Sequence, residues 1–120
     1  MKPVLIGLAV SMLSAPLAVP SLQAQAAVPE GNGQNGKRLF VESYCSACHG
    51  TMGQGGAAGA RIAPRPIAFA AFQKYLRQPT GQMVPYTRNV LSDRDLADIY
   101  AFLRSVPASS SSKDIALLRQ

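Results

Sequence analysis

Cys45-Ser46-Ala47-Cys48-His49 is the stretch that decides how this chain folds: two cysteines lie three positions apart, and a histidine follows the second. This spacing is the attachment signature of a c-type haem. Each thiol can add across one vinyl group of the porphyrin, and the histidine can then offer an imidazole nitrogen to the iron. The chain has 1 histidine, so an imidazole ligand from this chain can come only from His49.

Three other interpretations of the motif carry less weight. A dithiol redox motif belongs in a βαβ context, which the sequence does not show. A structural zinc site generally has four Cys or His ligands, whereas this chain has 2 cysteines and 1 histidine. A disulfide between Cys45 and Cys48 would close a very short loop and add little stability. The sequence therefore favours covalently bound haem c with its iron.

The first 26 residues have the three regions of a secretory signal peptide. The basic residue Lys2 precedes an apolar run over 4–19, and an A-x-A cleavage pattern ends at Ala26. The run is interrupted by prolines and is short of the roughly 20 apolar residues that a membrane span needs, which favours cleavage over an uncleaved anchor. We therefore expect a mature chain that begins at Ala27, has no membrane span and lies in the periplasm, since haem is attached to this motif outside the cytoplasm in bacteria.

The composition is basic, with 12 Lys and Arg against 6 Asp and Glu. Removal of Lys2 with the signal peptide leaves a formal charge of +5 on the mature chain before haem is added. The basic residues are scattered without interleaved aromatic residues, which argues against a nucleic-acid role; they include Lys37, Arg38, Arg61, Arg65, Lys74, Arg77 and Arg88. Two readings stay open: a positive face that steers the domain to an acidic protein partner, and a charge that only keeps the protein soluble.

The chain divides into four parts. Residues 27–35 are rich in Pro and Gly and predict a flexible segment, and residues 108–120 form a Ser-rich hinge and a tail. The domain proper is expected over 36–107, after the signal peptide of residues 1–26. A core this small gains from packing around a buried porphyrin. No strand, repeat or second domain is evident.

Two helices are predicted before the last one. The first is expected over roughly 34–44, where Gly36 is unfavourable by about 1 kcal/mol relative to Ala and indicates the close approach of another backbone. The second is expected over 66–77, because a proline such as Pro66 suits the first helical position. Between them, the glycine-rich segment 50–59 has no phosphate-binding pattern and is expected to wrap closely around the haem edge.

The last helix has clear signals at both ends. Ser92 is the expected N-cap, and Asp95 completes a weak form of the capping box. Pro107 ends the helix. Apolar residues follow at i, i+3, i+4 and i+7 and predict one buried face: Leu96, Ile99, Tyr100 and Leu103.

Met83 is the leading candidate for a second axial ligand. It lies in the predicted loop 78–90, far enough after His49 to return over the opposite haem face. Met52 is the rival thioether, but its position three residues after His49 ties it to the proximal side. A lone methionine is more often core filler, and only the haem motif favours a ligand here. A thioether ligand would favour ferrous iron and raise the reduction potential.

These features resemble a class I, mono-haem cytochrome c of the small soluble bacterial type over essentially the whole mature chain. The matching residues are the haem motif with Gly50, the pair Gly36 and Phe40 in the first helix, the pair Ile99 and Phe102 in the last helix, and the methionine segment from Gly81 to Thr87. The resemblance implies an all-α cytochrome c fold with three to four helices around one covalently bound haem.

The chain departs from the family pattern at three places. Val84 separates Met83 from the following proline, and Phe40 stands one residue further from Cys45 than is commonest, so a slight bulge in the first helix is expected. The family also tends to have a proline whose carbonyl accepts a hydrogen bond from the haem histidine. In its place the carbonyl of Ala60, Arg61 or Pro64 could serve.

The resemblance implies a single-electron carrier, not an enzyme, in which Cys45 and Cys48 attach the haem and His49 and Met83 bind its iron. Its partners would be redox proteins such as a dehydrogenase, an oxidase or a reductase. Two alternatives remain: a cytochrome subunit bound tightly to a periplasmic dehydrogenase, for example a flavoprotein, and an open-site haem sensor or peroxidase-like enzyme, which would require displacement of Met83.

Overall fold

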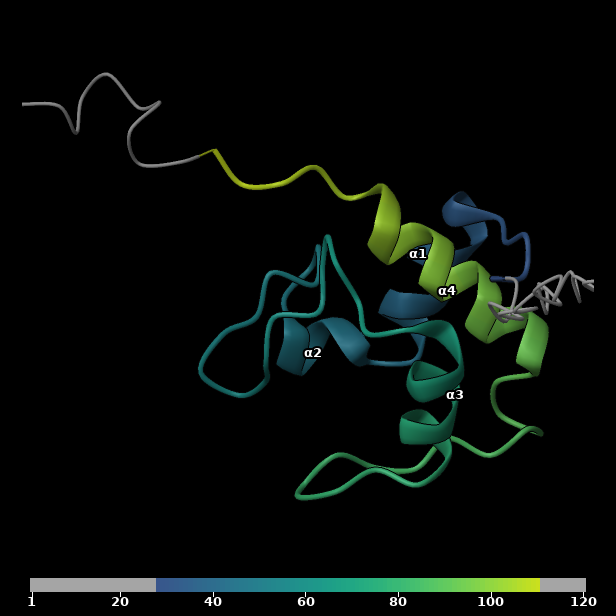
Figure 1. Cartoon of the computed structure of the whole chain (residues 1–120). Helices are drawn as coiled ribbons and strands as arrows, with labels where there is room; N and C mark the ends of the chain where they lie inside the picture. The colour runs from purple at the N-terminus through teal and green to yellow at the C-terminus, as the bar shows by residue number, and fades with distance from the viewer. Residues whose placement is uncertain (1–27, 111–120) are drawn as a thin grey trace, which may run out of the picture.

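A computed structural model describes residues 28–110 of the protein (Figure 1). The predicted signal peptide, residues 1–26, lies outside the described residues, as does most of the predicted tail. The described part forms four helices, and no strand is assigned within it. The helices are α1 (Gly33–Glu42), α2 (Cys45–His49), α3 (Phe69–Arg77) and α4 (Asp93–Ser105). The prediction of an all-α fold is confirmed.

Helices α1 and α4, which lie at the two ends of the domain sequence, pack against each other (Figure 1). A Cβ atom added at Gly36 would lie 1.9 Å from the carbonyl oxygen of Asp98, so only glycine lets the two backbones come this close. The rings of Phe40 and Phe102 lie 5.5 Å apart, centroid to centroid, beside this contact. The predicted close approach at Gly36 and the pairing of Phe40 with Phe102 are both confirmed.

Helix α1 starts and ends earlier than predicted. The Asn32 side chain accepts hydrogen bonds from the backbone N–H groups of Gln34 and Asn35 and caps the helix, so the helix begins within the segment expected to be irregular. It ends at Glu42, two residues short of the prediction, because Tyr44 takes a left-handed conformation with φ of 61°. No bulge is assigned within α1, and the expected bulge is replaced by a break in the chain between α1 and α2.

Helix α3 begins at Phe69, so the predicted start at Pro66 is wrong. Ala68 is the N-cap and has an extended ψ of 140°. The first helical turn closes only where the Phe72 N–H reaches the Ala68 carbonyl, at 2.9 Å. Once formed, the helix packs Phe72 against Tyr100 of α4, with ring centroids 5.4 Å apart.

Helix α4 follows the prediction closely. The Ser92 side chain accepts from the Asp95 N–H while the Asp95 carboxylate accepts from the Ser92 N–H, which is the reciprocal capping box. The helix ends at Ser105, two residues before Pro107. All four predicted core residues of this helix are buried, and the core around them comprises Phe40, Ala63, Phe72, Leu76, Leu91, Leu96, Ile99, Tyr100, Phe102 and Leu103.

Candidate functional site

The haem motif forms the one-turn helix α2, which contains no buried residue. Cys45 is half-buried, Cys48 is exposed, and both are free thiols. Residues at i and i+3 share one face of a helix, so the two thiols are presented together. Burial raises the pKa of the Cys45 thiol above its ordinary value of 9.0.

His49 is oriented by a backbone carbonyl. Its Nδ1 lies 2.7 Å from the carbonyl oxygen of Ala60. A carbonyl can only accept, so neutral His49 carries its proton on Nδ1 and leaves Nε2 with a free lone pair. Such a bond fixes the ring and makes the other nitrogen a better metal ligand. Of the three carbonyls that the sequence left open, the structure selects that of Ala60.

The glycine-rich segment turns back onto α2 and brings Ala60 to the histidine. The Gly55 N–H donates to the His49 carbonyl at 2.8 Å, and the N–H groups of Ile62 and Ala63 both donate to the Gly53 carbonyl at 2.9 Å. A Cβ at Gly59 would lie 2.7 Å from the Cys48 carbonyl oxygen. These glycines therefore permit close contact with the protein's own backbone.

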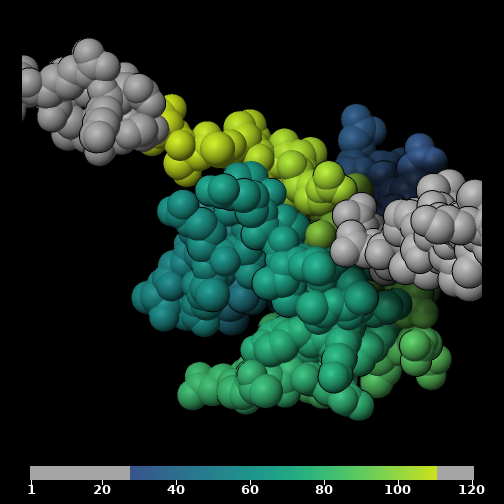
Figure 2. All heavy atoms as spheres, in the orientation of Figure 1, coloured from purple at the N-terminus to yellow at the C-terminus, as the bar shows by residue number. Residues whose placement is uncertain are grey.

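Met83 lies half-buried in the loop between α3 and α4 and packs against the core. The same loop is joined to the chain just before α2, because the Tyr86 hydroxyl donates to the Ser43 carbonyl at 2.6 Å. Burial, followed by the nearby Cys45, raises the pKa of Tyr86 to about 12, so the hydroxyl keeps its proton at neutral pH. In the space-filling view the green loop after α3 projects beside the teal region that follows α2, with an open recess between them (Figure 2).

Met52 has different surroundings from Met83. It packs against the core and lines a surface hollow together with residues of α1 and of the end of α4: Asn32, Gly33, Gln34, Lys37, Phe102 and Ser105. Met52 is thus already engaged at the α1–α4 pair, on the part of the domain that holds the two long helices.

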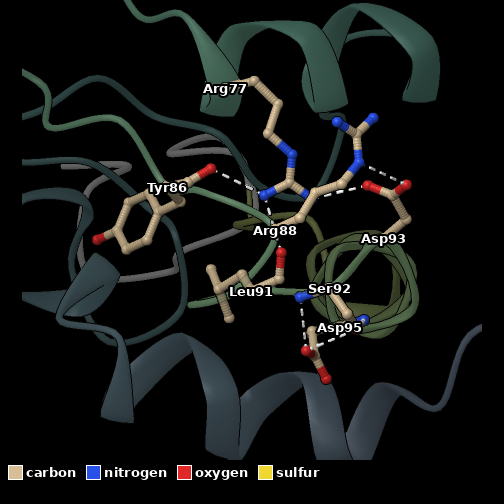
Figure 3. A network of polar contacts seen from close by, with 7 residues as sticks. All are labelled: Arg77, Tyr86, Arg88, Leu91, Ser92, Asp93 and Asp95. Carbon is tan, nitrogen blue, oxygen red and sulfur yellow. Dashed lines mark hydrogen bonds and ion pairs between the residues drawn. The ribbon is translucent and has the colours of Figure 1, made fainter.

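Sequence reasoning counted Arg77 only as part of the surface charge, and the structure gives it a larger part. Its guanidinium bonds the carbonyls of Tyr86 and Leu91 and the carboxylate of Asp93 (Figure 3). The sequence does hold a signal for this role: an arginine stands in the last turn of a predicted helix, directly before the methionine loop.

Neither a cluster of metal-binding side chains nor a membrane span is found in the described part of the chain. Within 28–110, no group of three or more His, Cys, Asp or Glu side chains is placed to hold a metal ion. In the same range, no helix is long and apolar enough to cross a membrane.

Comparison with known proteins gives the family. Residues 31–103 match the family model described as "Cytochrome C oxidase, cbb3-type, subunit III", a span that runs from the N-cap region of α1 into α4. The curated "Cytochrome c" of Tetrahymena pyriformis is 29% identical over 108 residues, which cover 70% of this chain and 97% of that protein. No solved structure gives a significant match. The chain belongs to this family of mono-haem cytochromes c, as the resemblance predicted.

The family's cofactor is covalently bound haem c with its iron, and its general task is haem-based electron transfer. The donor set described above fits this cofactor: two free thiols one turn apart, an imidazole with one nitrogen engaged and the other free, and a half-buried thioether on a neighbouring loop.

Proposed function

We propose that the protein is a periplasmic single-electron carrier in which Cys45 and Cys48 attach haem c and His49 and Met83 bind its iron. The observation that carries this proposal is the 2.7 Å bond between His49 Nδ1 and the Ala60 carbonyl. It orients an imidazole with a free Nε2 directly after the two thiols, which is the arrangement a proximal ligand needs.

The covalent step uses the two cysteines. Cys45 and Cys48 would hold the haem through one C–S bond each, formed by addition of the S–H across one vinyl group so that the hydrogen goes to the neighbouring vinyl carbon. Cys48 is exposed and Cys45 only half-buried, so both sulfurs are accessible to this addition. The haem c so held supplies a one-electron couple between ferric and ferrous iron.

Met83 is proposed as the second iron ligand because its loop is tied next to the attachment helix through Tyr86 and Ser43. A thioether at this position favours the ferrous state and raises the potential. It also fills the position that a small ligand would otherwise take. This is the feature that distinguishes a carrier from an open-site sensor or peroxidase.

Electron transfer itself requires no acid or base from the protein. Cytochrome c domains meet redox partner proteins, and the formal charge of +5 on residues 27–120 would steer this domain toward an acidic partner. We propose the predicted division into a signal peptide over 1–26, a segment over 27–35, a cytochrome c domain over 36–107 and a tail over 108–120, with one change: the domain begins with α1 at Gly33.

A second candidate function is that of a cytochrome subunit held permanently in a larger redox complex. The family model is named after a subunit of an oxidase, and a periplasmic dehydrogenase is the other candidate for the complex. Gel filtration of the native protein separates the two functions: a carrier elutes at the size of one chain, and a subunit elutes with its complex.

The proposed attachment is tested by extraction with acidified acetone. Haem held by Cys45 and Cys48 stays on the polypeptide, and Cys45→Ala with Cys48→Ala should release all of it. A wild-type protein that loses its colour to the acetone would refute covalent attachment at these residues.

A further inference from the structure

The guanidinium of Arg77 joins the two ends of the loop that carries Met83 (Figure 3). Arg77 ends α3, and the loop follows it directly. Its Nη1 donates to the Tyr86 carbonyl and to the Leu91 carbonyl, each at 2.8 Å, and its Nη2 donates to Asp93 Oδ1 at 2.7 Å. One side chain therefore fixes the path by which the loop leaves α3 and enters α4.

Arg77 and Arg88 both pair with Asp93, but the side chain of Arg77 is much less exposed. The Arg77 side chain is 14% exposed, while that of Arg88, which meets Asp93 Oδ2 at 3.2 Å, is 71% exposed. The Nε of Arg77 is buried and has no hydrogen-bond partner within residues 28–110. A partly buried ion pair that leaves one buried N–H without a partner contributes little net stability. The arrangement is better explained by the geometry that it imposes on the loop.

Tyr86 connects the loop that Arg77 fixes to the residue just before the haem motif. The Tyr86 N–H donates to the Leu76 carbonyl at 2.9 Å, and its carbonyl accepts from Arg77. Its hydroxyl donates to the Ser43 carbonyl, just before α2. Tyr86 is thus held on three sides, and Met83 stands three residues before it in the chain.

We propose that Arg77 is a positioning residue that holds the Met83 loop in its iron-binding conformation by fixing Tyr86 and Leu91. The inference rests on the proposed function, since it requires Met83 to be the iron ligand. If the loop is already fixed before Met83 binds the iron, binding does not have to offset the conformational entropy lost on ordering the loop. Without Arg77 the loop should open more often and leave the iron accessible to an added ligand for a larger fraction of the time.

The test compares Arg77→Gln with Arg88→Gln in the full-length holoprotein. Cyanide, added to the ferric form, competes with Met83 for iron. Because the apparent affinity scales with the open fraction, Arg77→Gln should bind cyanide roughly tenfold or more tightly than wild type. Arg88→Gln removes a charge from the same carboxylate without touching a loop carbonyl and should stay within about twofold of wild type.

A second measurement does not depend on the iron. Hydrogen exchange at the Tyr86 amide should accelerate in Arg77→Gln and stay unchanged in Arg88→Gln, whereas α4 amides such as that of Ile99 should keep their protection in both. If Arg77→Gln does not fold, Arg77→Lys replaces it: lysine keeps the pair with Asp93 but lacks the planar fork that reaches both carbonyls. Wild-type cyanide affinity and exchange in that variant would overturn the proposal.

Met83→Ala separates this inference from the proposed function. In the Met83→Ala background, Arg77→Gln should add no further increase in cyanide affinity, because no thioether is left to displace. If Met83→Ala opens the iron but Arg77→Gln changes neither cyanide affinity nor exchange, the positioning role is wrong and the ligand assignment stands. If Met83→Ala itself has no effect on cyanide binding, the proposed ligand set is wrong.

Discussion

Gly36 of α1 lies directly against the backbone of Asp98 in α4: a Cβ at position 36 would be 1.9 Å from the Asp98 carbonyl oxygen and 2.8 Å from the Ile99 nitrogen. Both obstacles are backbone atoms of a helix, so no side-chain rotation could relieve the clash. The approach of α1 to α4 therefore depends on the missing side chain, and the pair formed by Phe40 and Phe102 depends on that approach.

Gly36→Ala should destabilise the protein, because the two helices must separate to admit the methyl group. We expect a loss of about 2 kcal/mol or more in the free energy of unfolding, despite the better helix propensity of alanine. Chemical denaturation followed by far-UV circular dichroism measures it. Gly33→Ala is the matched control, since a Cβ there meets only ordinary contacts, 3.5 Å from the Phe102 nitrogen. Equal stability of the two variants would contradict the packing described here.

Asp98 should make the stability of the protein depend on pH in the acidic range. The residue is 4% exposed; its two oxygens accept from the Asn32 N–H at 2.7 Å and from the Asn35 amide at 2.8 Å. Burial acts to raise its pKa, but these hydrogen bonds, aided by Arg94, outweigh it and hold the pKa below the ordinary 3.8. A pKa lowered by folding means that the stabilisation is complete above about 3.8 and is lost as the pH falls through the folded value.

Asp98→Asn should therefore lose about 1–3 kcal/mol near neutral pH and show a flatter stability profile below pH 4 than wild type. Urea denaturation at a series of pH values measures both. Asp93→Asn serves as the comparison and should change the acid profile less: Asp93 also has a lowered pKa, caused first by Arg77 and then by Arg88, but it lies at the surface and not in the α1–α4 contact, and exposed pairs contribute little. If Asp98→Asn keeps the full acid slope of wild type, Asp98 is not the group responsible.

Much of this fold could be read from local signals. Ser92 and Asp95 define the start of α4 because capping uses neighbouring residues, and Gly36 could be singled out because its position in a helix is costly. The start of α3 was misplaced because a proline at a helix start is permitted but not required. In the structure Phe69 and Phe72 of this helix pack against Tyr100 of α4, a contact that no local pattern contains.

The candidate site, too, has residues that could be predicted from the sequence and residues that could not. The motif at α2 is contiguous, so its residues could be named from sequence. The carbonyl that orients His49 could not, since the choice of Ala60 depends on how the glycine segment turns back onto α2. Arg77 was missed for a related reason: its partners Tyr86 and Leu91 are brought to it only when the loop closes.

Gly59→Ala should weaken the orientation of His49. A Cβ at Gly59 would lie 2.7 Å from the Cys48 carbonyl oxygen, so the segment must shift and carry the Ala60 carbonyl away from Nδ1. We expect the His49 Nδ1–H to exchange with solvent roughly tenfold or more faster, measured by NMR of the holoprotein. Gly56→Ala is the control, because a Cβ there meets nothing within 4 Å. Identical exchange in both variants would count against this account of the loop.

The proposed export predicts a defined N-terminus. The A-x-A pattern that ends at Ala26 should direct cleavage there, so the intact mass of the protein from the periplasm should correspond to residues 27–120 plus one haem. A mass that includes residues 1–26 would support the uncleaved anchor instead. Ala26→Asp, which removes the small residue at the cleavage site, should cause the signal peptide to be retained.

The most direct test of the central claim is the ferric spectrum and carbon monoxide binding of Met83→Ala. The covalent bonds from Cys45 and Cys48 and the ligand His49 still hold the haem in this variant, so it should stay folded. Because the Met83 sulfur is gone, the variant should lose the sulfur-to-iron charge-transfer band, bind carbon monoxide readily in the ferrous form and have a lower reduction potential. Met52→Ala should keep the wild-type spectrum and resist carbon monoxide, as wild type does, because Met52 packs beside α1 and α4. A wild-type protein that already binds carbon monoxide freely, with a spectrum unchanged by Met83→Ala, would contradict the carrier function and favour an open iron site.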